Sequence, residues 1–127
     1  MATTLQPRLS VVMPCYNESA TIGEIVKRVL ASPHTAELVI VDDGSTDGTR
    51  DLLTSFDDDR VKIVLQPENM GKGAAIRRGF HEAQSDFVIV QDADLEYDPV
   101  DYDLMLEPLL LGNADVVFGS RFQSGRP

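Results

Sequence analysis

Short apolar runs alternate along the chain with longer stretches in which apolar residues recur every three or four positions. The short runs are rich in β-branched residues, which predicts strands. They lie at residues 9–13, 38–41, 61–65, 87–90 and 116–118. Because strands and helices alternate, the pattern predicts an α/β fold, with a mostly parallel, Rossmann-like sheet and helices on both faces.

Each predicted helix shows one apolar side. The first begins near Thr21, where Thr21 and Glu24 have the spacing of a capping box. A short helix follows residue 45, another spans about residues 71–83, and a fourth opens at Asp98 and Pro99, a favourable cap and first position. The short helix is predicted to bury Thr49, Leu52, Leu53 and Phe56.

Size and composition limit the classes of protein that this chain can belong to. Its 127 residues suffice for one domain, and a net charge of −10 argues against binding nucleic acid, which requires a basic face. The single cysteine, Cys15, excludes an internal disulfide and is expected to be a buried small hydrophobe. His34 and His81 are expected at the surface, and so few histidines and cysteines make a zinc site improbable.

The most specific polar feature follows the apolar run at residues 87–90. Asp92 and Asp94 are two positions apart, a spacing that places both on one face of an extended chain, and Glu96 can add a third carboxylate. Carboxylates this close require a proton or a cation between them. Oxygen ligands of this kind favour a hard divalent ion, so the sequence predicts a site for Mg²⁺ or Mn²⁺.

Polar clusters also follow the other predicted strands. They occupy residues 16–18, residues 42–43 and Arg121. In a parallel sheet the carboxyl ends of the strands meet at one edge, where ligands bind next to a reversal of strand order. The clusters therefore predict a ligand site at that edge.

These segments, taken in order, resemble the nucleotide-binding half of a family 2 glycosyltransferase of GT-A fold. The resemblance rests on residues 11–18, 41–47, 69–73, 92–96 and 119–121. Within the family, residues 92–121 are most similar to polyprenyl-phosphate sugar transferases of the dolichyl-phosphate mannose synthase type. The resemblance implies transfer of a sugar, with inversion, from a UDP- or GDP-linked donor to a polyprenyl phosphate.

The resemblance also implies roles for individual residues. Asp94 is implied as the catalytic residue that ligates Mg²⁺ or Mn²⁺, with Asp92 and Glu96 as further ligands. The implied contacts to the nucleotide sugar come from Pro14, Tyr16, Glu18, Val41, Asp43, Asp92, Ala93 and Arg121.

Simpler roles stay open for several of these residues. Asp43 can be a turn residue, Glu18 can favour the start of a helix, and Arg121 can be a solvated charge. Lys72 falls in the first turn of a predicted helix, where a cation opposes the helix dipole. A nearby diphosphate or plain solvation would account for it equally, so Lys72 is not counted among the predicted site residues.

The resemblance further implies that the family's catalytic domain extends past this chain. We therefore expect residues 1–127 to form one donor-binding domain that is truncated at its C-terminus, binds donor and is poorly active alone. The sequence has no apolar run long enough to span a membrane and no signal peptide, which predicts a cytoplasmic protein. Any anchor to the membrane surface is expected beyond residue 127.

Other classes of function fit less well. A phosphatase that uses the first aspartate of Asp-x-Asp as nucleophile normally carries that pattern near its N-terminus and has no glutamate at the position of Glu96. A dinucleotide-binding dehydrogenase requires Gly-x-Gly-x-x-Gly after the first strand, where residues 14–18 contain no glycine. A module that binds a sugar nucleotide without turnover remains the main alternative.

Overall fold

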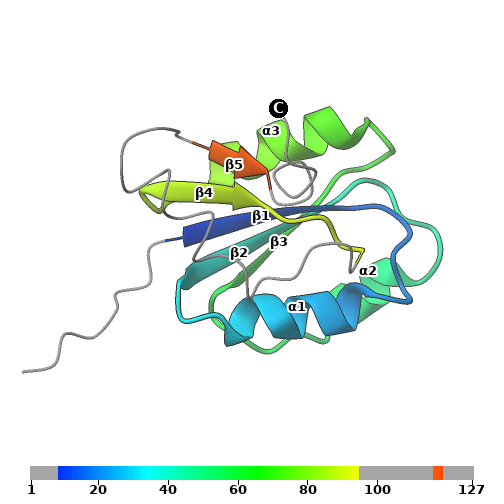
Figure 1. Ribbon diagram of the computed structural model, residues 1–127. Coiled ribbons are helices and arrows are strands. Elements are labelled where there is room, and N and C mark those ends of the chain that lie inside the picture. Colours follow the sequence, from blue (N-terminus) through cyan, green and yellow to red (C-terminus); the bar gives the residue numbers. More distant parts are fainter. Residues whose placement is uncertain (1–8, 95–115, 119–127) are drawn as a thin grey trace, which may run out of the picture.

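Five parallel strands form one sheet in the described part of the chain, in the order β3-β2-β1-β4-β5 (Figure 1). This computed structural model describes residues 9–94 and 116–118. The strands are β1 (Leu9–Cys15), β2 (Thr35–Asp42), β3 (Val61–Leu65), β4 (Phe87–Val90) and β5 (Val116–Phe118). The predicted parallel sheet is thus confirmed.

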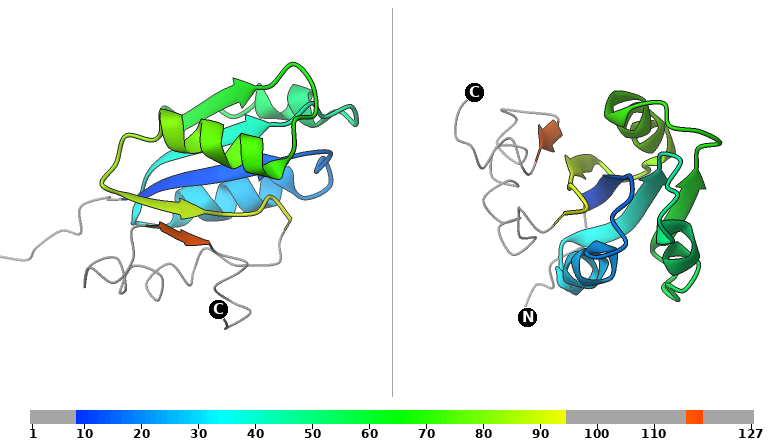
Figure 2. Two further views of the ribbon diagram at one scale, coloured as in Figure 1. Left: turned by 90° about the horizontal axis from the view of Figure 1, so that it is seen from above. Right: turned by 90° about the vertical axis from the view of Figure 1, so that its right-hand side faces the viewer.

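Helices cover both faces of the sheet, as the sequence predicted (Figure 1). Helices α1 (Ile22–Ala31) and α2 (Thr49–Leu53) lie on one face, and α3 (Lys72–Glu82) lies on the other (Figure 2). The side chains of β1 and most of β2 are buried because helices pack on each side of these central strands.

The hydrophobic core has two parts, one on each face. The larger part joins Val11, Met13 and Ile40 of the sheet to Ile25 and Val29 of α1. The smaller part packs Val39, Val41 and Val64 against Ala75 of α3. Alternate residues of each central strand therefore pack on opposite faces of the sheet. Because both faces are covered, the sequence of these strands is a continuous apolar run.

Helix α3 approaches the sheet closely at Gly79. A Cβ atom at this position would overlap Cγ1 of Val12, a side chain that is fully buried in β1. The two buried residues of α3, Ala75 and Gly79, are small, which permits this approach.

The strand order reverses at β1. From β1 the chain passes through α1 to β2 and through α2 to β3, and both of these strands lie on one side of β1. It then returns through α3 to β4, which lies on the other side of β1. The right-hand view of Figure 2 looks toward the carboxyl ends of the strands, where the polar loops gather. The crevice beyond β1 and β4 is the place where open parallel sheets bind ligands.

Two sequence-based expectations are wrong. Leu52 is 40% exposed, because Thr49 and Leu53, four residues apart, form the buried side of the single turn of α2 and Leu52 flanks it. His34 is buried, since it directly precedes β2 and its carbonyl oxygen accepts a hydrogen bond from Leu9 N–H (2.9 Å).

No helix among the described residues is long and apolar enough to cross a membrane. The helix predicted to open at Asp98 lies outside the described residues.

Candidate functional site

A cleft of about 270 Å³ opens beyond the carboxyl ends of β1 and β4, at the reversal of strand order. The lining comes from the end of β1 and the residues after it, from the segment after β4, and from the loop before α3 and its start. The cleft is lined by Pro14, Cys15, Tyr16, Glu18, Asp43, Asn69, Gly71, Lys72, Ala75, Asp92, Ala93 and Asp94.

Asp92 and Asp94 both line this cleft, although β4 already ends at Val90. Between them, Ala93 is 2% exposed and joins the core on the α1 face. The carbonyl oxygen of Ala93 accepts a hydrogen bond from the Thr21 hydroxyl (2.8 Å). The anchored alanine thus holds the segment in place while the flanking carboxylates border the cleft.

This bond corrects the role predicted for Thr21. The Thr21 side chain makes no capping bond to α1, and its backbone is already helical (φ −118°, ψ −18°). Its hydroxyl instead joins the start of α1 to the segment after β4, a contact between residues 72 positions apart.

Lys72, which was not counted among the predicted site residues, also lines the cleft. Its Nζ lies 2.6 Å from Asp92 Oδ1, and it is the one cationic side chain among the described residues that line the cleft. The signal in the sequence was its position in the first turn of a helix, where the dipole disfavours a cation. The structure supplies the missing reason, a carboxylate across the cleft.

Glu18 faces the same group of acids from the β1 side. Burial raises the pKa of Glu18 above its usual value of 4.5, and the charges of Asp94, Asp47 and Asp92 raise it further. The cleft therefore holds an excess of negative charge that a bound cation would relieve.

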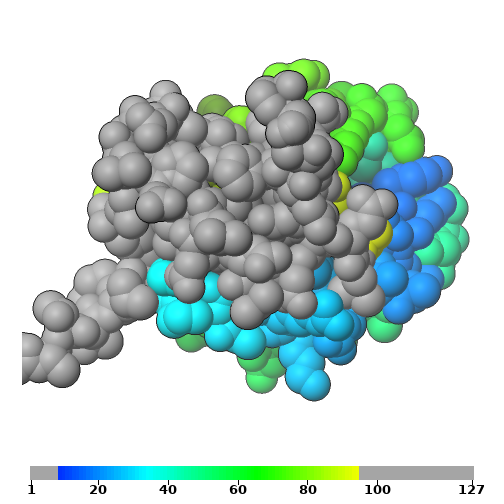
Figure 3. Space-filling model, viewed as in Figure 1, coloured from blue at the N-terminus to red at the C-terminus, as the bar shows by residue number. Residues whose placement is uncertain are grey.

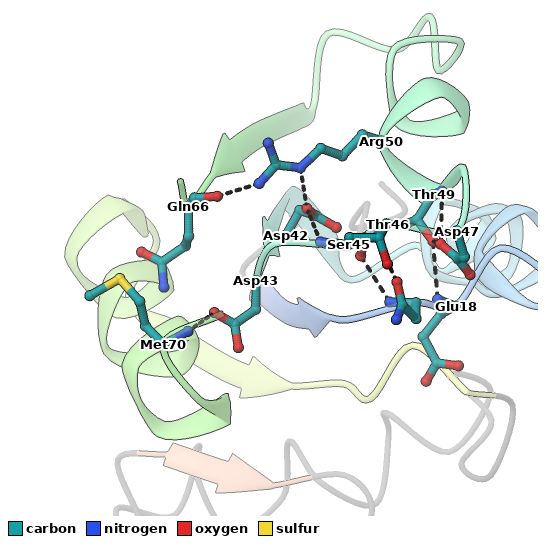
Figure 4. A network of polar contacts seen from close by, with 11 residues as sticks. Glu18, Asp42, Asp43, Ser45, Thr46, Asp47, Thr49, Arg50, Gln66 and Met70 are labelled. Atoms are coloured by element: carbon teal, nitrogen blue, oxygen red, sulfur yellow. Dashed lines mark hydrogen bonds and ion pairs between the residues drawn. The ribbon is translucent and has the colours of Figure 1, made fainter. Parts of the chain in front are cut away.

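Asp43 holds the loop that leads into α3. Its Oδ1 accepts a hydrogen bond from Met70 N–H (2.7 Å; Figure 4). Its Oδ2 accepts one from Gly71 N–H (2.9 Å). The carboxylate is 4% exposed, and each oxygen keeps one further lone pair for a ligand. Asp43 thus fixes the backbone immediately before Lys72.

The loop after β2 also holds the loop after β1. The hydroxyl of Ser45 accepts a hydrogen bond from Asn17 N–H (2.8 Å), and Thr46 N–H donates to Asn17 Oδ1 (2.8 Å). Asn17 has a φ of 54°, a left-handed conformation that asparagine tolerates better than most residues. Figure 3 shows these two loops, blue and teal, against each other at the right-hand edge.

A second set of bonds fixes the backbone of Glu18. Its N–H donates to Thr49 Oγ1 (3.1 Å), and Thr49 Oγ1 donates to Asp47 Oδ1 (2.5 Å) (Figure 4). The other oxygen of Asp47 accepts from Ser19 N–H (3.1 Å). The hydrogen bond from Thr49, ahead of the others, holds the pKa of Asp47 well below its usual range.

Asp42 and Gly44 complete this loop. Asp42 is fully buried, pairs with Arg50 (Nε to Oδ2, 2.6 Å) and accepts a hydrogen bond from Ser45 N–H (3.1 Å). Arg50 also donates to the carbonyl oxygen of Gln66 at the end of β3. Gly44 has a φ of 82°, and a Cβ there would lie 2.7 Å from Asn69 N, so only glycine fits.

Cys15 is buried at the end of β1. Burial, reinforced by the charge of Asp42, raises the pKa of its thiol to about 12. The thiol stays protonated at neutral pH, as expected of a structural rather than a reactive cysteine.

The structure brings together most of the residues predicted to contact the nucleotide sugar. Six of these line the cleft, namely Pro14, Tyr16, Glu18, Asp43, Asp92 and Ala93, and they are joined there by Asp94, the predicted metal ligand. Val41 does not, because it is fully buried between the sheet and α3. Glu96 and Arg121 lie outside the described residues.

The carboxylates of the cleft fit a hard divalent cation in kind and number. Mg²⁺ is usually held by one or two carboxylates, and water and substrate phosphates supply its other ligands. Asp92 and Asp94 provide such a pair. Within residues 9–94, no three histidine, cysteine, aspartate or glutamate side chains converge as a metal site.

Relatives of this chain include polyprenyl-phosphate sugar transferases. The chain is 33% identical over 139 residues to dodecaprenyl-phosphate galacturonate synthase of Rhizobium johnstonii, an alignment that covers 95% of this chain and 41% of that protein. It is 35% identical over 111 residues to undecaprenyl-phosphate 4-deoxy-4-formamido-L-arabinose transferase of Pseudomonas fluorescens, covering 82% of this chain and 33% of that one. The chain thus spans well under half the length of these relatives.

Solved structures agree with the fold. S. aureus TarS (residues 1–349) superposes with a TM-score of 0.68 and 26% identity, covering 81% of this chain and 32% of that one. Glucosyl-3-phosphoglycerate synthase from Mycobacterium tuberculosis superposes with a TM-score of 0.65 and 31% identity, covering 83% and 40%. These neighbours are GT-A glycosyltransferases, so the predicted fold is confirmed.

The family itself follows from the match along the chain. The family described as glycosyl transferase family 2 matches residues 10–127, nearly the whole sequence. This match separates the chain from the Asp-based phosphatases that share an Asp-x-Asp pattern after a strand. The chain belongs to glycosyl transferase family 2.

Proposed function

We propose that this chain forms the donor-binding part of an inverting glycosyltransferase that uses a UDP- or GDP-linked sugar, Mg²⁺ or Mn²⁺, and a polyprenyl phosphate acceptor. The observation that carries the proposal is the cleft at the β1/β4 crevice, which gathers Asp92, Asp94 and Lys72. The names of the polyprenyl-phosphate relatives support the class of acceptor.

The charges of the cleft suit a nucleoside diphosphate bound together with a cation. Asp92 and Asp94 would hold the cation, which neutralises charge on the diphosphate as it leaves the sugar. The backbone N–H groups at the start of α3, a helix with no acidic side chain in its first turn, would favour an anion nearby.

Another part of the cleft would receive the nucleoside. Tyr16 is 45% exposed at the cleft, and Pro14 lines it beside Asp43. The remaining lone pairs of the Asp43 carboxylate can accept the imide N–H of uracil or guanine. Val41 would support this pocket from beneath rather than touch the base.

A polyprenyl phosphate would react without a general base. Its phosphate oxygen is already an anion and can attack the anomeric carbon while the bond from that carbon to the donor diphosphate breaks. Under this proposal the described residues need only bind and orient the donor and stabilise the departing diphosphate.

Isothermal titration calorimetry with UDP and GDP, with and without Mn²⁺, tests this function. We expect binding that requires Mn²⁺ in the unaltered protein and that weakens at least tenfold in Asp94→Ala, because one carboxylate ligand of the cation is lost. Asp59→Ala, which removes an exposed carboxylate from the loop before β3, is the matched control and should bind normally. Equal nucleotide affinity in Asp94→Ala and the unaltered protein would refute the proposal.

A further inference from the structure

We propose that Lys72 binds the donor diphosphate and does so by exchanging partners: it pairs with Asp92 in the ligand-free cleft and is released when a divalent cation takes over that carboxylate. The inference rests on the proposed function and adds to it a residue and a coupling between the two ligands.

The ion pair joins a largely buried carboxylate, that of Asp92, to a largely exposed ammonium group, that of Lys72. The distance from Lys72 Nζ to Asp92 Oδ1 is 2.6 Å, yet the Lys72 side chain is 56% exposed whereas that of Asp92 is 14% exposed. A carboxylate with so little access to water requires a counter-charge. An exposed ammonium on a flexible stem can leave at small cost, because solvent-exposed ion pairs contribute little free energy.

The backbone of Lys72 is fixed although its side chain is not. Asp43 holds the N–H groups of Met70 and Gly71, and Gly71 adopts a φ of 98° directly before the helix. The Cα atom of Lys72 is therefore anchored at the cleft, and rotation about the side-chain bonds is enough to move the ammonium from one partner to another.

The charges of the described lining residues favour the exchange. Among the described residues that line the cleft, Lys72 is the one cation beside four acidic residues, Glu18, Asp43, Asp92 and Asp94. A diphosphate that enters adds negative charge, and Lys72 can serve it only if Asp92 receives another cation. Cation and nucleotide should therefore strengthen each other's binding by the same factor, as linkage requires.

The test is calorimetry of three proteins: the unaltered chain, Lys72→Met, and the control Lys27→Met. Lys27 is an exposed lysine of α1, so its substitution changes net charge equally without touching the cleft. Each protein is titrated with Mn²⁺ alone and, in saturating Mn²⁺, with UDP and GDP. Circular dichroism confirms that each variant folds.

We expect Lys72→Met to bind Mn²⁺ alone about two- to fivefold more tightly, because the competitor for Asp92 is gone. In saturating Mn²⁺ it should bind the nucleotide about tenfold more weakly, because a charge-assisted contact is lost. Lys27→Met should change either affinity by less than about twofold.

Each contrary result overturns one part of the proposal. Mn²⁺ affinity that is equal in Lys72→Met and the unaltered protein, or Mn²⁺ binding by neither, overturns the exchange. Unchanged nucleotide affinity in Lys72→Met overturns the contact with the diphosphate. The proposed function fails if the unaltered protein binds no nucleotide in the presence of Mn²⁺. The titration with Mn²⁺ alone would still show whether Lys72 competes with the cation for Asp92.

Discussion

Glu37 lies near the amino-terminal ends of the strands, opposite the cleft, and shows how one residue can stabilise that end of the sheet. Its Oε2 accepts hydrogen bonds from the Ser10 hydroxyl (2.5 Å) and from Gln84 N–H (2.5 Å), and its Oε1 lies 3.4 Å from Lys62 Nζ. One carboxylate thus joins β1, β2, β3 and the turn before β4.

The pKa of Glu37 gives this contact a dependence on pH. Burial raises the pKa, but the hydrogen bonds from Ser10 and Gln84 and the charge of Lys62 outweigh it, and the pKa falls below its usual value of 4.5. Because the folded pKa is lower than the unfolded one, folding favours the ionised form. Its stabilisation is complete above about pH 4.5 and is lost as the pH falls through the folded pKa.

We predict that Glu37→Gln lowers the free energy of unfolding by about 1 to 2 kcal/mol at pH 7, because a charged acceptor is lost. The difference from the unaltered protein should shrink at pH 3.5. Urea denaturation at both pH values measures it. Glu24→Gln, which removes a carboxylate that is 48% exposed on α1, is the control and should cost less than about 1 kcal/mol. A loss that is equal at both pH values would show that ionisation of Glu37 is not its source.

At the scale of elements, the strands and helices could be predicted because each has a clear period. The helix limits of α3 agree within one residue, while β1 and β2 extend beyond their predicted ends to Cys15 and Asp42. Pro14 in β1 and Asp42 in β2 concealed these extensions, because both residue types are depleted in strands; Asp42 is nevertheless fully buried, where it pairs with Arg50.

Contacts between distant segments could not be predicted in the same way. The acids after β4 were recognised from their spacing, but the pairing of Asp92 with Lys72 and the bond from Thr21 to Ala93 depend on the strand order. That order places β4 beside β1, although three helices and two strands separate them in the chain. No local pattern contains this information.

The packing of α3 on β1 leads to a prediction for a matched pair of glycines. Gly79→Ala should lower the free energy of unfolding by about 1 to 2 kcal/mol, since its Cβ would overlap the buried Val12 side chain and the gain in helix propensity offsets only part of this cost. Gly73→Ala should instead raise stability by up to about 1 kcal/mol, because its Cβ would meet only Arg77 Nη1 at 3.5 Å.

Urea denaturation of the two variants distinguishes these effects. Val12→Ala combined with Gly79→Ala should recover part of the cost of overlap, although it also loses buried apolar surface. Equal stability of the Gly79→Ala and Gly73→Ala variants would argue against close packing of α3.

At the scale of the whole molecule, the excess of acidic residues acts on stability. The chain carries 21 acidic and 11 basic residues, a net charge of −10. Self-repulsion of this charge opposes the compact state, and salt screens it over distances of about 10 Å at 0.1 M.

We predict that raising NaCl from 20 to 300 mM raises the Tm by about 2 to 5 °C. The double variant Asp57→Asn/Asp59→Asn removes two exposed charges and should show a smaller rise. Asp57→Glu/Asp59→Glu keeps the charge and should show the full rise. Thermal melts followed by circular dichroism measure all three, and identical increments in the three proteins would contradict the repulsion argument.

The loop of residues 42–49 bonds its neighbours largely through their main-chain amides. The donors at Glu18, Ser19, Met70 and Gly71 are peptide N–H groups, which substitution of the side chain does not remove. A protein engineer could therefore exchange the outward side chain of Met70, which is 55% exposed, and leave its bond to Asp43 in place. The surface next to the cleft can thus be varied while the loops that frame the cleft stay assembled.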